Sequence, residues 1–232
     1  MKTLVFDIET GPLPENELLA MLPAFDPAEV KCGNLKDPAK IAEKIAEAEV
    51  NHRRDFIERA ALDPLTGRVM AIGMLDLETD LFSIIGHDDE SETLREFWEV
   101  TRGDMGRLNP LIGFNIFNFD LPFLFRRSWK HRVTMPLGLR RGRYWGDQLV
   151  DLRDAWQLGD RQARGSLDSI AKHLGVGAKL AAPAANGATS GKLITGADFA
   201  GLWRSDRKQA EAYLRNDIDM TAKVAAALGV VV

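Results

Sequence analysis

Short apolar runs alternate with longer amphipathic segments along most of the chain. Runs of strand length that are bounded by polar residues or turn signals predict buried or half-buried strands. The expected strands are residues 3–6, 69–77, 81–85 and 110–114. Only three residues separate the second run from the third, so we expect these two strands to form a hairpin. Residues 149–152 fit either a strand or the start of a helix.

Helix signals lie between and after these runs. Asp37-Pro38 places a capping residue directly before a proline, which favours a helix from that point to about residue 61. The other expected helices are residues 91–102, 121–129, 166–175 and 206–228. Strands and helices that interleave in this way, with a hairpin early in the order, predict a single α/β domain with a mixed sheet.

Two segments carry weaker signals. Residues 11–35 contain four prolines and are expected to be irregular, with one short helix. Residues 175–197 are rich in glycine, alanine and serine and predict a flexible loop, with closure over a substrate as the alternative.

Composition narrows the class of protein. The chain has 232 residues, of which 45% are hydrophobic, and this is enough to bury a large core. The formal net charge of −4 does not mark a nucleic-acid binder, so the placement of charge matters more than its sum. Cys32 is the only cysteine, which excludes an intramolecular disulfide and disfavours a cysteine-based zinc site. The sequence has neither a signal-peptide pattern nor an apolar stretch of about 18 residues, so we expect a soluble cytoplasmic protein.

Two acids follow the first apolar run. Side chains at positions i and i+2 of a strand point to the same side, so Asp7 and Glu9 are expected to point together while Ile8 enters the core. An Asp-x-Glu pair is also common on protein surfaces, and alone it carries little weight.

A third acid, Asp120, follows the run at residues 110–114 and opens an expected helix. Aspartate is a favoured N-cap residue, and capping is the simpler interpretation. Capping does not explain why the acid stands among so many aromatic residues, where burying its charge is costly unless a cation neutralises it.

The last expected helix contains Tyr213 and Asp217, which share one face because they are four positions apart. Asp219 lies about 200° round the helix from Asp217 and is expected to face solvent. Taken alone, this pair indicates only a half-buried tyrosine and a surface acid.

Together the four acids predict a metal site. Oxygen ligands without a cysteine or histidine cluster favour Mg²⁺ or Mn²⁺ over zinc. Two such ions, roughly 3.5–4 Å apart, stabilise the attacking and leaving oxygens of an in-line phosphodiester cleavage. Tyr213 stands one helical turn from Asp217, where it can orient the attacking water.

These residues resemble the motifs of the DEDD 3′–5′ exonucleases, tyrosine subtype, and most of all the exonuclease domain of family B DNA polymerases, here as a stand-alone protein. The matching motifs are Phe6-Asp7-Ile8-Glu9-Thr10, Asn115-x-x-x-Phe119-Asp120 and Tyr213-x-x-x-Asp217. The resemblance covers residues 1–10 and about 66–228. Residues 12–65 are longer than the usual first connection, and we expect them to form a helical insertion in a single exonuclease domain that spans residues 1–232. This insertion is also the candidate site for a protein partner, whose identity the sequence does not show.

The resemblance implies a ribonuclease H-like fold, with a mixed five-stranded sheet flanked by helices. It implies removal of nucleotides from single-stranded DNA ends with two Mg²⁺ or Mn²⁺ ions as cofactors. Asp7, Glu9, Asp120 and Asp217 would be the metal ligands, and Tyr213 would position the water. Thr10, Gly11, Asn115 and Phe119 would contact the substrate. Phe114 departs from many relatives, which have a histidine there.

A basic and aromatic segment follows Asp120. Residues 121–146 contain no acid. Its basic residues are Arg126, Arg127, Lys130, Arg132, Arg140, Arg141 and Arg143, and its exposed aromatic candidates are Phe123, Phe125, Trp129, Tyr144 and Trp145. Basic groups can follow phosphates and aromatic rings can stack on unpaired bases, so a groove for single-stranded 3′ ends is one interpretation. Phenylalanines in the core beneath a basic surface are the other. We expect Arg126 and Arg127 to contact the substrate, and we expect no membrane contact.

Three other functions fit part of the pattern. An aspartate-nucleophile phosphotransferase also has an Asp after its first strand, but it needs a second Asp where Glu9 stands. A non-catalytic nucleic-acid-binding module would be expected to lack one of the four acids. An exoribonuclease stays open, because carboxylates do not recognise the sugar and a 2′-hydroxyl contact cannot be seen in the sequence.

Overall fold

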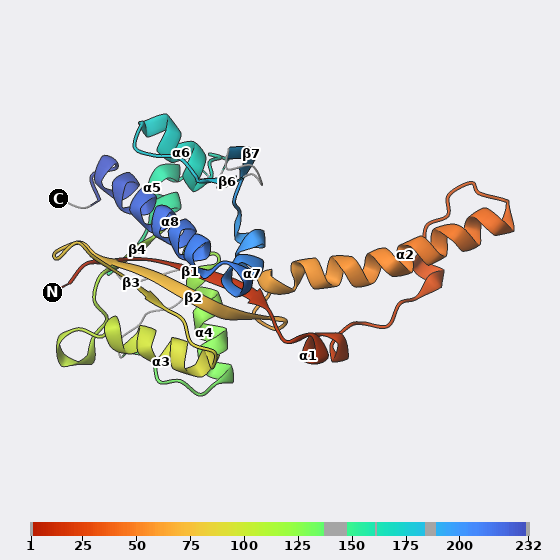
Figure 1. The fold of residues 1–232 in the computed structure, drawn as a ribbon, viewed down its shortest axis with the longest axis horizontal. Coiled ribbons are helices and arrows are strands. Elements are labelled where there is room, and N and C mark those ends of the chain that lie inside the picture. Colours follow the sequence, from red (N-terminus) through yellow and green to blue (C-terminus); the bar gives the residue numbers. More distant parts are fainter. Residues whose placement is uncertain (1, 137–147, 161, 184–188, 231–232) are drawn as a thin grey trace. The chain divides into compact units, whose positions relative to one another are not determined.

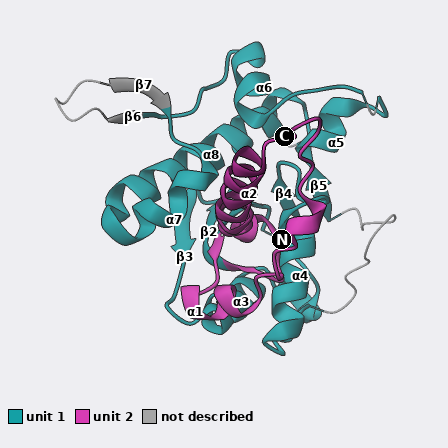
Figure 2. Ribbon diagram, turned by 90° about the vertical axis from the view of Figure 1, so that its right-hand side faces the viewer, with its two compact units in different colours: residues 1–10, 69–232 teal, residues 11–68 magenta. Residues whose placement is uncertain are grey.

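The computed structural model describes residues 2–136, 148–160, 162–183 and 189–230 (Figure 1). For residues 182, 183 and 189–192 it describes the backbone only. The chain divides into two compact units, one made of residues 1–10 and 69–232 and the other of residues 11–68 (Figure 2). In the described residues, no helix combines the length and the apolar character that crossing a membrane requires.

A mixed sheet of five strands organises the larger unit. Its strands are β1 (Leu4–Pro12), β2 (Gly67–Asp76), β3 (Leu81–Ile85), β4 (Leu111–Gly113) and β5 (Leu149–Asp151), in the spatial order β3-β2-β1-β4-β5. Strand β4 is parallel to both β1 and β5, and β2 and β3 form the expected antiparallel hairpin. The predicted mixed five-stranded sheet is therefore confirmed.

Helices cover both faces of this sheet (Figure 1). The helices of the larger unit are α3 (Glu90–Val100), α4 (Asp120–Lys130), α5 (Leu152–Gln157), α6 (Leu167–Leu174), α7 (Gly196–Ser205) and α8 (Arg207–Ala227). One core lies on the side of α3 and α4, where it includes Phe6 and Ile8 of β1. The second core lies on the side of α5 to α8, where it includes Val5 of β1. Because side chains alternate along a strand, Asp7 and Glu9 share the side of Val5 and α8.

The first strand is longer than the apolar run predicted. It extends from Leu4 to Pro12 instead of ending at residue 6, so Asp7 and Glu9 lie within the strand and not at its end. Strands that are covered on both faces normally read as continuous apolar runs, and the apolar pattern therefore missed the second half of β1, which carries polar residues.

The segment 175–197 contains more regular structure than a loop. Strands β6 (Ala181–Pro183) and β7 (Thr189–Leu193) pair antiparallel, and α7 begins at Gly196. Helix α7 was missed, although Thr195 and Asp198 form a capping box that the sequence contains. The alternatives for residues 149–152 both hold in part, because β5 ends at Asp151 and α5 follows at once.

The smaller unit holds α1 (Glu15–Ala20) and α2 (Pro38–Arg59). Asp37 caps α2 as expected, since its carboxylate accepts a hydrogen bond from the Ala39 N–H at 3.0 Å. The core of this unit is small, with Leu13, Leu18 and Ala60 buried, and none of the 22 residues of α2 is fully buried.

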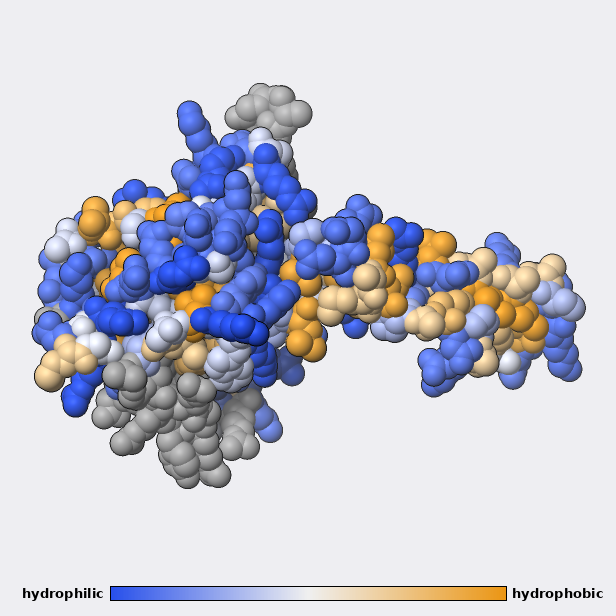
Figure 3. All heavy atoms as spheres, turned by 90° about the horizontal axis from the view of Figure 1, so that it is seen from below, coloured by the Kyte–Doolittle hydropathy of each residue, from blue (hydrophilic) through white to orange (hydrophobic). Residues whose placement is uncertain are grey.

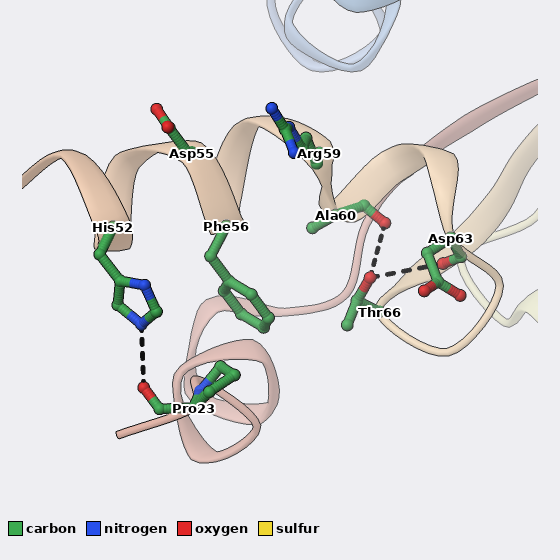
Figure 4. Close-up of a pocket in the computed structure, with 8 residues that line it drawn as sticks. All are labelled: Pro23, His52, Asp55, Phe56, Arg59, Ala60, Asp63 and Thr66. Atoms are coloured by element: carbon green, nitrogen blue, oxygen red, sulfur yellow. Dashed lines mark hydrogen bonds between the residues drawn. The ribbon is translucent and has the colours of Figure 1, made fainter. Parts of the chain in front are cut away.

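A pocket of about 410 Å³ lies beside α2 (Figure 4). His52 contacts the carbonyl oxygen of Pro23 at 3.0 Å on its edge, and Asp55 and Arg59 also line it. Figure 3 shows hydrophobic side chains on the surface of this unit, and Val50 and Leu65 are each 68% exposed. A protein partner for residues 12–65 stays a prediction.

Candidate metal centre

Three carboxylates from two elements meet on the α8 side of the sheet. Asp7, Glu9 and Asp217 each offer an oxygen, and these oxygens lie within 4.8 Å of one another. Strand alternation brings the first two together, and Asp217 reaches them from the buried face of α8. Glu9 and Asp217 are buried, and Asp7 is half-buried.

Burial and mutual repulsion make it unfavourable for all three carboxylates of this cluster to be charged at once. Burial raises the pKa of Asp7 well above its ordinary value, and the charges of Asp120 and Asp217 raise it further. Burial likewise raises the pKa of Glu9, with Asp7 and Asp217 adding to the effect. Burial raises the pKa of Asp217 too, although Lys179 counteracts part of the shift. Carboxylates in this arrangement favour either a proton or a cation.

The donor set fits a hard divalent cation. Asp217 Oδ1 is buried and has no hydrogen-bond partner within the described residues. A buried acceptor is normally satisfied, so an orphaned carboxylate oxygen beside two other acids indicates a place for a cation. Oxygen ligands of this kind suit Mg²⁺ or Mn²⁺.

Asp120 comes from α4, which packs on the face of the sheet opposite α8. It is the first residue of α4, where Phe119 occupies the N-cap position, so the simple capping interpretation of Asp120 is wrong. Its Oδ1 accepts a hydrogen bond from the Ile8 N–H of β1 at 3.2 Å. Burial raises the pKa of Asp120 to about 7, against the hydrogen bond from Ile8. Asp120 acts on Asp7 through its charge but is not among the three acids whose oxygens meet.

Tyr213 lies one helical turn from Asp217, and its ring is buried. Burial, followed by the charges of Glu9 and Asp217, raises the pKa of the phenol far above its ordinary value. The hydroxyl therefore stays protonated at any physiological pH. Its oxygen accepts a hydrogen bond from Lys179 Nζ at 3.2 Å.

No pattern in the sequence indicates a role for Lys179. Its ammonium lies 3.3 Å from Asp217 Oδ2, and its backbone N–H donates to Asp168 at 2.8 Å. Lys179 stands 34 positions before Tyr213, in a stretch predicted as a loop, so only the tertiary structure brings it to the acids. It is the basic residue that lowers the pKa of Asp217.

The residues expected to contact substrate fall into two groups. Thr10 and Gly11 are buried within β1. Asn115 and Phe119 lie in the turn between β4 and α4, where the ring of Phe119 lies 5.6 Å from that of Phe123. Asn115 has a left-handed backbone, with φ at 63°.

The described residues of the basic and aromatic segment also fall into two groups, one exposed and one buried. Arg126 is exposed, but the guanidinium of Arg127 is buried and forms an ion pair with Glu90 at 2.5 Å. This placement argues against the expected substrate role of Arg127. Phe123 and Phe125 belong to the core, whereas Trp129 is 53% exposed. Arg140, Arg141, Arg143, Tyr144 and Trp145 lie outside the described residues.

Replacing Arg127 by alanine is expected to lower the free energy of unfolding by about 3–5 kcal/mol, because Glu90 would remain buried without its main partner. The hydrogen bonds from Arg127 and Val69 hold the pKa of Glu90 below its ordinary value despite its burial. Urea unfolding measures the loss. Arg126→Ala is the matched control, and equal losses in both variants would contradict the assigned role of the ion pair.

Comparison with known proteins identifies the family. A model of the ribonuclease H superfamily matches residues 56–227. The chain belongs to the ribonuclease H superfamily. Among solved structures, a family B DNA polymerase from the hyperthermophilic archaeon Pyrobaculum calidifontis is similar, with a TM-score of 0.61 and 18% identity over 98% of this chain. The chain spans 24% of that polymerase. No curated protein matches.

Membership of the ribonuclease H superfamily confirms the expected fold and supports a nuclease-type function. Nucleases of this superfamily generally use divalent metal ions, and the buried acids of this chain form a matching cluster. The similarity to the polymerase shows only that the two proteins share a fold.

Proposed function

We propose that this ribonuclease H superfamily protein is a metal-dependent 3′–5′ exonuclease of the DEDD tyrosine subtype, acting on single-stranded DNA ends. The observation that carries the proposal is the meeting of Asp7, Glu9 and Asp217 oxygens within 4.8 Å. The chain would act as one exonuclease domain, with residues 12–65 as a helical insertion.

The four acids would hold the cofactor. Asp7, Glu9, Asp120 and Asp217 are the proposed ligands of two Mg²⁺ or Mn²⁺ ions. Such ions, when bound, stabilise the attacking and leaving oxygens of an in-line displacement at phosphorus. The unpartnered Asp217 Oδ1 and the raised pKa values of all four carboxyls support this assignment.

Tyr213 would orient the attacking water. A hydroxyl that stays protonated has one hydrogen to donate, while its oxygen can accept from a water. The phenol lies among the same acids, since Glu9, Asp217 and Asp7 all raise its pKa. Burial of the ring fixes its position, which favours an orienting role over proton transfer.

Substrate contacts are proposed for the surface around these acids. Thr10, Gly11, Asn115 and Phe119 would contact the terminal nucleotide, and Arg126 would contact a phosphate of the strand. Arg127 is left out of this group because its charge is committed to Glu90.

Cleavage of matched single strands tests the proposal. The purified protein is incubated with DNA and RNA of one sequence, in Mg²⁺, Mn²⁺ or a chelator. We expect metal-dependent shortening that is faster on DNA. Faster shortening of RNA would change the assignment to an exoribonuclease. Cleavage of neither strand by folded protein in metal would overturn the proposal and favour a binding module.

Lys179→Ala is expected to slow cleavage by about 10–100-fold while the protein stays folded, because the lysine holds both Asp217 and the Tyr213 hydroxyl in place. Single-turnover rates at saturating Mg²⁺ measure the effect. Lys172→Ala is the matched control, since Lys172 is 51% exposed and pairs with Asp168 on α6. A wild-type rate in Lys179→Ala would remove Lys179 from the site.

A further inference from the structure

A further buried acid, Asp151, lies at the end of β5, and its carboxylate accepts hydrogen bonds from the turn that leads to Asp120. Its carboxylate is only 4% exposed and accepts hydrogen bonds from three backbone N–H groups. Oδ1 accepts from Asn115 at 2.7 Å and from Arg153 at 2.9 Å, while Oδ2 accepts from Phe117 at 2.9 Å. Two of these donors come from a segment more than 30 positions earlier in the chain.

The turn that Asp151 holds has an unfavourable backbone. Asn115 adopts φ of 63°, which costs a residue with a side chain about 1–3 kcal/mol and persists only when neighbouring groups hold it. Its carbonyl oxygen accepts from the N–H groups of Asn118 and Phe119, each at 3.2 Å, and the chain then enters α4. The conformation of this turn sets where α4 begins.

Asp120 depends directly on that starting point. It is the first residue of α4, and its carboxylate must reach across to the Ile8 N–H of β1. Asp151 stands beside the turn because β4 and β5 pair in parallel, with Gly113 opposite Asp151. A short path of backbone therefore connects the carboxylate of Asp151 to that of Asp120.

We propose that Asp151 is a positioning residue, which holds the 115–118 turn and thereby aims Asp120 at the acid cluster. The inference rests on the proposed nuclease function. Asp151 touches neither Asp7 nor Asp217 through any hydrogen bond of the described structure, so it acts through the backbone. Burial raises the pKa of Asp151, and the three N–H donors counteract part of that shift.

Capping of α5 alone does not explain Asp151. The side chain caps this helix through the Arg153 N–H, which uses Oδ1 only. Serine caps helices about as well as aspartate, but its single oxygen cannot also serve both Asn115 and Phe117. The two roles can therefore be separated by substitution.

Two variants and one control follow from the contacts. Asp151→Asn retains Oδ1 and replaces Oδ2 by an amide that opposes the Phe117 N–H, while Asp151→Ser retains only the cap. Asp89→Asn makes the same exchange at the N-cap of α3, where the carboxylate accepts from Ser91 at 2.8 Å. Thermal unfolding identifies any variant that fails to fold.

Hydrogen exchange and metal binding provide readouts that need no activity. We expect both Asp151 variants to lose amide protection in the peptide spanning residues 113–121. We expect their Mn²⁺ affinity, measured by electron paramagnetic resonance, and their kcat to fall by about 10–100-fold, with KM for the oligonucleotide unchanged. Asp89→Asn should match the wild type in amide protection, Mn²⁺ affinity and kcat.

The outcomes separate the inference from the function it rests on. Lost protection with wild-type Mn²⁺ affinity and kcat would make Asp151 merely structural and would overturn the inference. Unchanged amide protection would show that the hydrogen bonds of Asp151 do not hold the 115–118 turn, and this too would overturn the inference. A folded wild type that neither binds Mn²⁺ nor cleaves nucleic acid would instead refute the proposed function.

Discussion

Asp217→Asn is expected to slow metal-dependent cleavage by about 1,000-fold or more, with the fold intact. The substitution replaces one oxygen of the cluster by an amide nitrogen and removes a charge that lies beside Asp7, Glu9 and Lys179. Single-turnover cleavage at saturating Mg²⁺ measures the rate.

Helix α8 offers a matched control for this substitution. Asp219 lies two positions further on, with its side chain 43% exposed and 3.9 Å from Arg215. Asp219→Asn should cleave at the wild-type rate. A folded Asp217→Asn variant that cleaves as fast as Asp219→Asn would refute the metal centre, and so would a fully active Asp7→Ala.

The metal-free protein is expected to lose stability through its acid cluster as the pH rises from about 4 to about 7. Asp7, Glu9, Asp120 and Asp217 all have raised pKa values, and that of Asp120 reaches about 7. The folded state therefore holds protons in this range that the unfolded state has released, and each further rise in pH favours unfolding.

The contribution of the cluster is measured by difference. Acids with lowered pKa values, such as Glu90 and Asp168, change stability in the opposite direction, because their contribution is lost as the pH falls. Comparing wild type with Asp120→Asn across pH removes these common effects. We expect the variant to be the more stable protein at pH 7 without metal.

Mg²⁺ should narrow the difference in stability between the wild type and Asp120→Asn. A cation that binds only the folded state raises the free energy of unfolding by about 2.7 kcal/mol at 100 times its dissociation constant. The wild type should gain this stability and Asp120→Asn should gain less. Identical unfolding curves with Mg²⁺ and with a chelator would contradict a metal site at these acids.

The acids themselves could be selected from the sequence because each lies in a regular element. Strand alternation predicted that Asp7 and Glu9 share a side, and the structure brings their oxygens together with that of Asp217. Helical spacing placed Tyr213 beside Asp217, and both side chains are buried as expected for one inward face. Their role as metal ligands and water-orienting group stays a prediction.

The residues that support the acids could not be predicted in this way. Lys179 lies in an irregular segment and Asp151 at a strand end, and the partners that connect them to the site, Asp217 and Asn115, lie more than 30 positions away in the sequence. Arg127 shows the converse. The local sequence indicates a basic surface, but a buried Glu90 from another helix takes the charge. Contacts of this kind depend on tertiary packing, which neither spacing nor composition encodes.

The direction of cleavage distinguishes a 3′–5′ exonuclease from other nucleases. A single-stranded DNA labelled at its 5′ end is incubated with Mg²⁺ and the wild-type protein, beside reactions with a chelator and with Asp217→Asn. We expect a ladder that shortens from the 3′ end one nucleotide at a time in the first reaction, and intact strand in the other two. Release of the label as a 5′ mononucleotide, internal fragments, or an intact strand in the first reaction would contradict the proposed function.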